Sequence, residues 1–244
     1  MKKLLKTAVM VFYMTAKYNP ATLEELKTLV SDPDVNLGDI DTTQITSMEK
    51  LFRDSNRRDF SGIETWNTSH VKCMKCMFQN AEYFNNPIGN WDTSSVTDMQ
   101  SMFRGAVSFN QPLADWDISA VTNLSCMFDG AKSFNQPIGC WDTSSVVNMA
   151  SMFSGAESFN QQVGDWDTSA VTSMQLMFQN AVSFNQPLEN WDTSRVEFMS
   201  SMFSGAVKFN QPLGGWNTSS VKYMSRMFEG AESFNQPIGS WQVK

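Results

Sequence analysis

The chain has 244 residues and a formal net charge of −7, and the acidic excess lies after residue 60. Residues 1–60 carry nine acids and nine bases, whereas residues 61–244 carry 16 acids and nine bases. Nucleic-acid binding needs clustered lysine and arginine, so this balance argues against a nucleic-acid partner. The sequence contains no run of 18 or more apolar residues, so no segment is predicted to span a membrane.

Residues 1–18 are predicted to be a signal-like segment or an N-terminal helix. The basic start MKK is followed by an apolar stretch that ends near Ala16, as in secretory signals. Lys6 interrupts this stretch, and Met14 is large for the third position before a cleavage after Ala16. The alternative is an amphipathic helix that packs on the rest of the protein.

Residues 19–59 are predicted to form an N-terminal cap and a degenerate first repeat. Thr22 and Glu25 fit a capping box at the start of a helix over residues 21–30. This helix is expected to cover the open end of a stacked array, because an uncovered end exposes core and strand edges. Its apolar face consists of Leu23, Leu26, Leu29 and Val30.

A regular 25-residue unit repeats through residues 60–244, and its tryptophan is numbered here as position 1. A fixed period of this length indicates a solenoid, in which each repeat forms one turn of a stack. The type copy runs from Trp91 to Asp115. The tryptophans are Trp66, Trp91, Trp116, Trp141, Trp166, Trp191, Trp216 and Trp241.

Each unit is predicted to contain a short helix and a very short parallel strand. Positions 6, 9, 12, 13 and 16 are apolar at helical spacing, and Gly105 of the type copy resembles a helix stop. Around the tryptophan the apolar period is two, which favours a strand stacked about 4.8 Å from its neighbours. The asparagine at position 20 recurs in seven copies and is expected to form a ladder that satisfies backbone groups.

The unit SFNQPIGNWDTSSVTDMQSMFRGA resembles the FNQ-x-L-x-x-W-D-x-S-x-V-x-x-M-x-x-M-F repeat of BspA-like bacterial surface proteins, which are related to the leucine-rich repeats. The resemblance covers about residues 40–244. It implies a right-handed, leucine-rich-repeat-like solenoid on a bacterial cell surface, with a role in adhesion or host-protein binding. This chain differs from such proteins in that no lipoprotein cysteine is recognisable near its start.

Catalytic motifs are absent from the sequence, so no enzyme activity and no cofactor are predicted. There is no glycine-rich phosphate loop, no HExxH and no Ser–His–Asp set, and His70 is the single histidine. Cys73 and Cys76 form one isolated CxxC, which is more typical of free thiols than of a metal site.

The strongest enzymatic alternative is a carbohydrate-acting solenoid that uses a pair of carboxylates. Asp115 with Asp117, and Asp165 with Asp167, are the candidate pairs. Aspartate recurs at position 2 throughout the array, however, which favours a role in turns and caps. We therefore expect a non-enzymatic solenoid for adhesion or protein–protein binding. A structural or self-assembling spacer is the other alternative.

A protein partner, including a host protein, is expected to bind where the repeat changes most. Position 8 becomes aromatic in Phe198 and Tyr223, whereas earlier copies have Cys, Asp, Asn or Ser. Aromatic and basic residues are enriched in protein contacts. The alternative is that the two rings only stack on each other. The candidate surface consists of Leu176, Arg195, Phe198, Lys222, Tyr223 and Arg226.

Position 2 is predicted to form an outward-facing acidic column. Each aspartate either caps its own turn, or the column forms a docking strip for a basic partner or a cation such as calcium. The column consists of Asp92, Asp117, Asp142, Asp167 and Asp192.

The last unit begins at Trp241 and stops at Lys244, before the segment predicted to be helical. An uncovered end would expose unpaired backbone groups, which favours either a shortened chain or a weak end-to-end homodimer. The predicted location is the cell surface or the extracellular medium, with the cytoplasm as the alternative.

Overall fold

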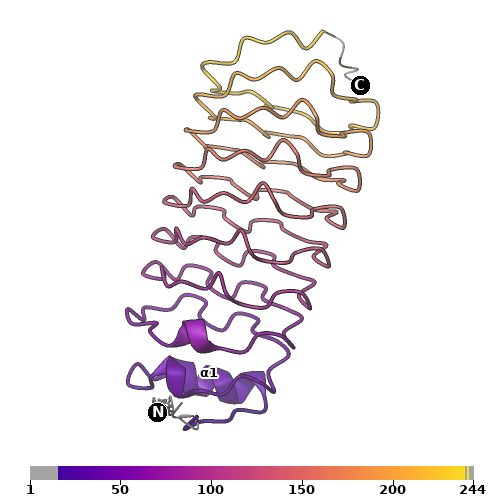
Figure 1. Cartoon of the computed structure of the whole chain (residues 1–244). Coiled ribbons are helices and arrows are strands. Elements are labelled where there is room, and N and C mark those ends of the chain that lie inside the picture. Colours follow the sequence, from indigo (N-terminus) through magenta and orange to yellow (C-terminus); the bar gives the residue numbers. More distant parts are fainter. Residues whose placement is uncertain (1–15, 240, 242–244) are drawn as a thin grey trace, which may run out of the picture.

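The computed structural model describes residues 16–239 and residue 241, so residues 1–15 of the segment predicted to be signal-like or helical lie outside the described residues. Figure 1 shows a single elongated stack of similar turns, with α1 near one end and the last turns at the other. Each 25-residue turn is called a rung here. The solenoid predicted from the repeat is therefore present, while its right-handed winding and the end-to-end homodimer stay predictions.

The N-terminal end of the stack is covered by helix α1, Leu23–Ser31, as predicted from the capping box. The Thr22 hydroxyl accepts from the Glu25 N–H at 3.2 Å, and the Glu25 carboxylate accepts from the Ala21 N–H at 2.7 Å. Leu26 and Val30 are buried against the first rung. Two short 3₁₀ helices follow, η1 at Leu37–Asp39 and η2 at Ile63–Thr65.

The strand predicted at the tryptophan is wrong. Isolated parallel bridges join residues at position 8 instead, from Ser47 with Cys73 to Phe198 with Tyr223. The backbone N–H of the tryptophan is already used in a local turn. In Trp116, for example, it donates to the carbonyl of Leu113, three residues earlier, at 3.2 Å. The backbone N–H groups that point along the stack are instead those at positions 7, 9, 11, 13 and 15, and each donates to a carbonyl of an adjacent rung.

The short helix predicted over positions 6–16 is also wrong, because this segment is a series of turns. Met102 N–H donates to Met99 within its rung at 3.1 Å, whereas Phe103 N–H donates to Met127 of the next rung at 2.9 Å. Ser101 at position 11 and Gly105 at position 15 have φ of 57° and 68°, which an α-helix cannot include. Successive turns of three residues produce the same apolar spacing as a helix, which explains the error.

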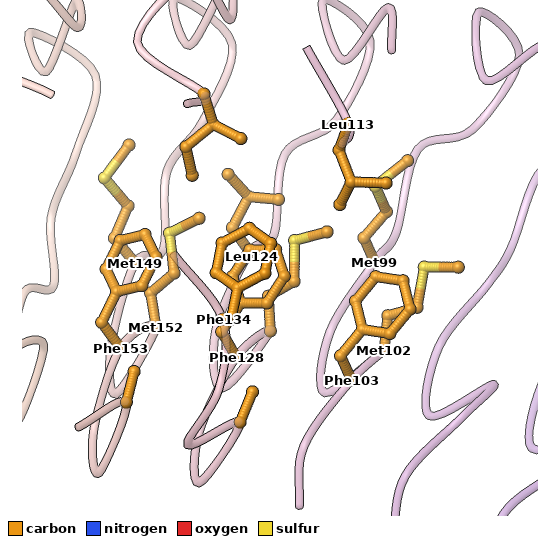
Figure 2. Packing of buried hydrophobic residues seen from close by; sticks show 14 of the residues in the cluster. Met99, Met102, Phe103, Leu113, Leu124, Phe128, Phe134, Met149, Met152 and Phe153 are labelled. Carbon is orange, nitrogen blue, oxygen red and sulfur yellow. The ribbon is translucent and has the colours of Figure 1, made fainter. Parts of the chain in front are cut away.

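The core consists of columns in which each side chain stacks on its counterpart in the next rung (Figure 2). Phe103 and Phe128 have ring centroids 5.6 Å apart and an interplanar angle of 7°. Trp141 and Trp166 stack at 6.4 Å, and both rings are almost completely buried. The methionines at positions 9 and 12 lie in the same interior, which confirms the prediction that the repeated apolar residues build one continuous core.

Polar side chains also connect the rungs. The Trp141 indole N–H donates to the Leu113 carbonyl of the preceding rung at 3.0 Å. The Thr93 hydroxyl donates to the Asp117 carbonyl of the next rung at 2.8 Å. Position 20 forms the predicted asparagine ladder, in which each side-chain oxygen accepts the backbone N–H of the next asparagine.

We predict that Trp141→Ala lowers the free energy of unfolding by about 3–5 kcal/mol, because it leaves a large cavity in mid-stack. Since each rung contacts only its neighbours, unfolding is expected to separate into two transitions. Chemical denaturation followed by circular dichroism measures both effects. Trp141→Phe is the control, because it keeps an aromatic ring and removes only the indole N–H; equal losses in both variants would contradict a packing role.

A second prediction concerns the asparagine ladder. Asn135→Ala leaves the Asn160 N–H and the Gln161 side-chain amide without the oxygen that each uses at 3.0 and 2.9 Å. We expect a loss of about 1 kcal/mol, as for one intramolecular hydrogen bond. Asn135→Asp keeps an acceptor oxygen and should cost less. The urea midpoint tests this, and equal destabilisation by the two variants would show that the ladder bonds are dispensable.

Candidate interaction surface

The bridges at position 8 run along the stack as one column of partly exposed side chains. In three consecutive rungs this residue has a side-chain oxygen that accepts a backbone N–H two residues later. The bond lengths are 2.8 Å for Asp98, 3.0 Å for Asn123 and 2.9 Å for Asn148. These bonds are Asx turns, which fix the local backbone from within the rung. Position 8 thus has a local structural role in the middle of the array.

Phe198 and Tyr223 replace these Asx turns with a pair of stacked rings. Their centroids are 5.4 Å apart, with an interplanar angle of 7°. Phe198 is half-buried, whereas Tyr223 is 58% exposed and is one of three large hydrophobic residues exposed in the described part of the chain. The structure therefore brings together the two aromatic residues predicted from the sequence and leaves one of them open to solvent.

The basic character predicted around these rings is mostly neutralised. Lys222 forms an ion pair of 2.7 Å with Glu197, and Arg226 lies 3.6 Å from Glu229. Arg195 is exposed and belongs to none of the ion pairs in the described residues. The prediction from the sequence included the three cations but not the acids that face them from the same or the preceding rung. This part of the prediction is corrected: the rings are bordered by ion pairs and one unpaired arginine.

Leu176 lies at position 11, where the backbone has φ of 60°. Its N–H donates to the Ser200 carbonyl of the next rung at 2.9 Å, and its side chain is half-buried. A branched apolar residue is uncommon in this left-handed region.

The acidic column at position 2 is exposed, and each aspartate bonds within its own turn. Asp142 accepts from the N–H and the hydroxyl of Ser144 at 3.0 and 2.6 Å. These bonds lower the pKa of the Asp142 carboxyl, and the other four aspartates show the same shift for the same reason. Each aspartate of the column thus accepts a hydrogen bond from its own turn, as in the simpler of the two predictions.

The negative charges of neighbouring aspartates oppose this lowering of the pKa only weakly. Asp92 and Asp142 act on Asp117 as like charges that raise its pKa, but their influence is smaller than that of the Ser119 hydroxyl and N–H. Asn67 and Asn217 make the same bond at the two ends of the column. The turn therefore needs an acceptor oxygen rather than a charge at this position.

The family described as "Mycoplasma protein of unknown function, DUF285" matches four overlapping segments of the chain: residues 22–123, 46–166, 113–196 and 158–244. Together these segments cover nearly all of the sequence. The chain belongs to the DUF285 family. No curated protein and no solved structure matches it.

All four cysteines of this DUF285 protein are free. Cys73 takes part in the bridge column and Cys76 is buried, which is consistent with the free thiols predicted for this CxxC. Burial raises the pKa of the Cys73 and Cys126 thiols, and a raised pKa disfavours the reactive thiolate. Within the described residues, no group of three or more His, Cys, Asp or Glu side chains is placed to hold a metal ion.

Two further features of the DUF285 array were not predicted. Arg58 lies over the Tyr83 ring at 4.1 Å, and Tyr83 is 42% exposed. Arg57 connects the first rung to the cap through backbone carbonyls of residues 30, 32 and 35. In the sequence, only the irregular spacing of the first repeat indicated that Arg57 and Arg58 lie in an unusual segment. None of the helices in the described part of the chain is long and apolar enough to cross a membrane.

We predict that changing Asp117, Asp142 and Asp167 together to Asn reduces the loss of stability that the protein undergoes at acidic pH. The folded-state pKa of each lies below the unfolded value of 3.8, so these carboxylates stabilise the fold above about pH 4, and the contribution is lost as the pH falls through the folded-state pKa. Asparagine keeps the acceptor without titrating.

The measurement is the urea midpoint at about pH 6 and about pH 2.5. The matched control changes Glu82, Glu189 and Glu232 to Gln, which removes three exposed charges outside the Asx turns. A loss of stability on acidification that is equal in the wild type, the aspartate variant and the control would contradict the lowered pKa of these three carboxyls in the folded state.

Proposed function

We propose that this protein is a non-enzymatic solenoid that binds a protein partner through the aromatic end of the position 8 column. Phe198 and Tyr223 carry the proposal. They stack face to face, and Tyr223 presents more than half of its surface to solvent. Rigid, exposed aromatic residues with arginine nearby are typical of the residues that dominate binding energy at protein interfaces.

The uniformity of the rest of the array supports this assignment. In three mid-array rungs the position 8 side chain bonds to its own backbone, so it contributes to the fold. The aromatic residues give up that bond and gain only a ring contact worth about 0.5–1.5 kcal/mol. A change that exchanges a local hydrogen bond for exposed aromatic surface is more readily explained by binding than by stability.

The repeat pattern extends this proposal to adhesion at the cell surface. Its FNQ, WD and MF elements resemble those of BspA-like bacterial surface proteins, for which a surface location and host-protein binding are expected. In this proposal the protein is exposed on the cell or secreted, and an extracellular host protein is the partner. A solenoid suits that task because its stacked rungs hold an extended surface rigid.

A structural spacer is the alternative, favoured by the acidic column, in which every carboxylate bonds inward to its own turn. A spacer needs a uniform surface, and the column is uniform. The paired aromatic residues are the feature that this alternative leaves unexplained. The carbohydrate-acting alternative has less support, since Asp117 and Asp167 are each occupied by a serine two residues later.

The test compares the wild type with the double variant Phe198→Asn and Tyr223→Asn. Asparagine at position 8 forms an Asx turn in two other rungs, so the fold should be kept. Immobilised protein is exposed to host plasma and extracellular-matrix proteins, captured partners are identified by mass spectrometry, and their Kd values are measured. We expect the double variant to lose about ten-fold or more in affinity, with an unchanged melting temperature.

The matched control is Val147→Thr, which removes another exposed apolar side chain, 42% accessible, and restores the residue used at Thr97, Thr122 and Thr172. Binding should be unaffected. A double variant that binds every captured partner as tightly as the wild type, but melts at a lower temperature, would show that the rings serve packing alone.

A further inference from the structure

The first repeat differs from all later ones in the length of one segment. Phe52 and Phe60 are eight residues apart in sequence, whereas the equivalent pair is six residues apart in each later unit, as in Phe78 and Phe84. The two extra residues make room for a loop that carries Arg57, and this side chain reaches across to the end of α1. The repeat is interrupted here as clearly as at the aromatic pair.

Arg57 has a half-buried positive charge that forms no ion pair within the described residues, although Asp59 and Asp32 lie near enough to act on it electrostatically. Its guanidinium donates to the carbonyls of Val30 at 3.3 Å and Asp32 at 3.0 Å, and also to those of Val35 and Asp59 at 2.5 Å. All four acceptors are neutral, and no ion pair in the described residues includes Arg57. A guanidinium has five N–H donors, so one of them is still free.

A cleft of about 460 Å³ lies beside this guanidinium, between α1 and the extra loop, and is called the cap cleft here. Its apolar lining includes Val30, Leu51 and Phe52, whose side chains are 5%, 6% and 2% exposed. Ser55 and Asn56 add polar groups from the loop. The volume is in the range of cavities that bind small molecules and short peptide segments.

All charges that line the cap cleft are positive. Lys27 and Arg53 join Arg57, and none of the described residues in the lining is acidic. Lys27 pairs with Glu24 at 2.9 Å and Arg53 with Asp54 at 3.2 Å, but both acids are largely exposed and lie outside the cleft. Exposed ion pairs of this kind stabilise a protein only slightly, so a ligand carboxylate can replace either acid.

We propose that the cap cleft binds the C-terminal end of a peptide chain whose last side chain is apolar. The terminal carboxylate accepts a hydrogen bond from the one remaining N–H of Arg57 and pairs with Arg53, whose guanidinium can bind a carboxylate in a bidentate manner. The terminal side chain packs on Leu51 and Phe52. The polar side chains of the loop bind the preceding peptide group. This site is separate from the aromatic pair and does not depend on it.

The polar groups of the loop favour a peptide over a plain fatty acid, because a hydrocarbon chain offers nothing to Ser55 and Asn56. The apolar lining favours a peptide over inorganic phosphate, which has no surface to bury there.

The experiment is a calorimetric titration of the full chain with acetyl-Ala-Ala-Leu that ends in a free carboxylate, and with the same peptide as its C-terminal amide. We expect the carboxylate form to bind at least about ten-fold more tightly, because the amide removes the negative charge that would pair with Arg53 and Arg57. Hexanoate and inorganic phosphate are titrated in the same way and should each bind more weakly than the peptide carboxylate.

The variant Lys27→Gln with Arg53→Gln removes two cations from the rim and keeps Arg57, which is needed to fix the cap. It should weaken peptide binding about ten-fold while leaving the melting temperature unchanged. Lys72→Gln with Lys208→Gln is the matched control, since it removes the same charge from exposed residues outside the cleft. The control and the Phe198→Asn, Tyr223→Asn variant should both bind the peptide as the wild type does.

The comparison of peptide carboxylate with peptide amide uses only the wild type, so the proposal can be tested even if the rim variant fails to fold. Equal affinity for both peptides, or no binding of either, would overturn it. Hexanoate or phosphate that binds as tightly as the peptide carboxylate would overturn the assignment of a peptide C-terminus.

Discussion

Each rung of this protein forms backbone hydrogen bonds with the next rung and packs its core side chains against it. The rest of the structure depends on this contact between neighbouring rungs. Backbone N–H groups at positions 9, 11, 13 and 15 donate to the following rung, as Met99 and Phe103 do. The aromatic rings at positions 1, 13 and 19 stack on identical rings. A ring replaced at one of these three aromatic positions would disturb two interfaces, which explains why positions 1, 13 and 19 hardly vary along the chain.

The outward-facing positions are free of this constraint, and most of them satisfy their polar groups locally. Aspartates at position 2 and Asp or Asn at position 8 each bond to their own turn. Many of the negative charges of the protein therefore lie on side chains that accept hydrogen bonds from backbone N–H groups of their own turns. This explains how a column of like charges can lie along the stack with the pKa of every aspartate lowered rather than raised.

Departures from the repeat stand out against this regular background. The exposed aromatic pair near the C-terminal end replaces Asx turns, and the extra loop near α1 introduces a guanidinium that is held by backbone carbonyls. Both are places where the chain gives up a local arrangement that other rungs retain. The two candidate binding surfaces lie toward opposite ends of the solenoid, so one molecule has room to hold two partners at once (Figure 1).

The sequence alone determined the period, the rung boundaries, the buried tryptophan column, the asparagine ladder and the capping box of α1. These follow from identity at fixed spacing, because a residue that recurs in every rung must have the same neighbours in every rung. The sequence also identified Phe198 and Tyr223, since they are the clearest departure from that identity.

Only the tertiary structure decided the backbone path within a rung. Successive three-residue turns with residues such as Ser101 in the left-handed region place apolar side chains at the spacing of a helix, so periodicity cannot distinguish the two. The bridges at position 8, the Glu197 partner of Lys222 and the carbonyls around Arg57 also depend on which residues from other rungs or from the cap lie opposite. Such pairs are set by the stacking of segments about 25 residues apart, and no local pattern in the sequence records them.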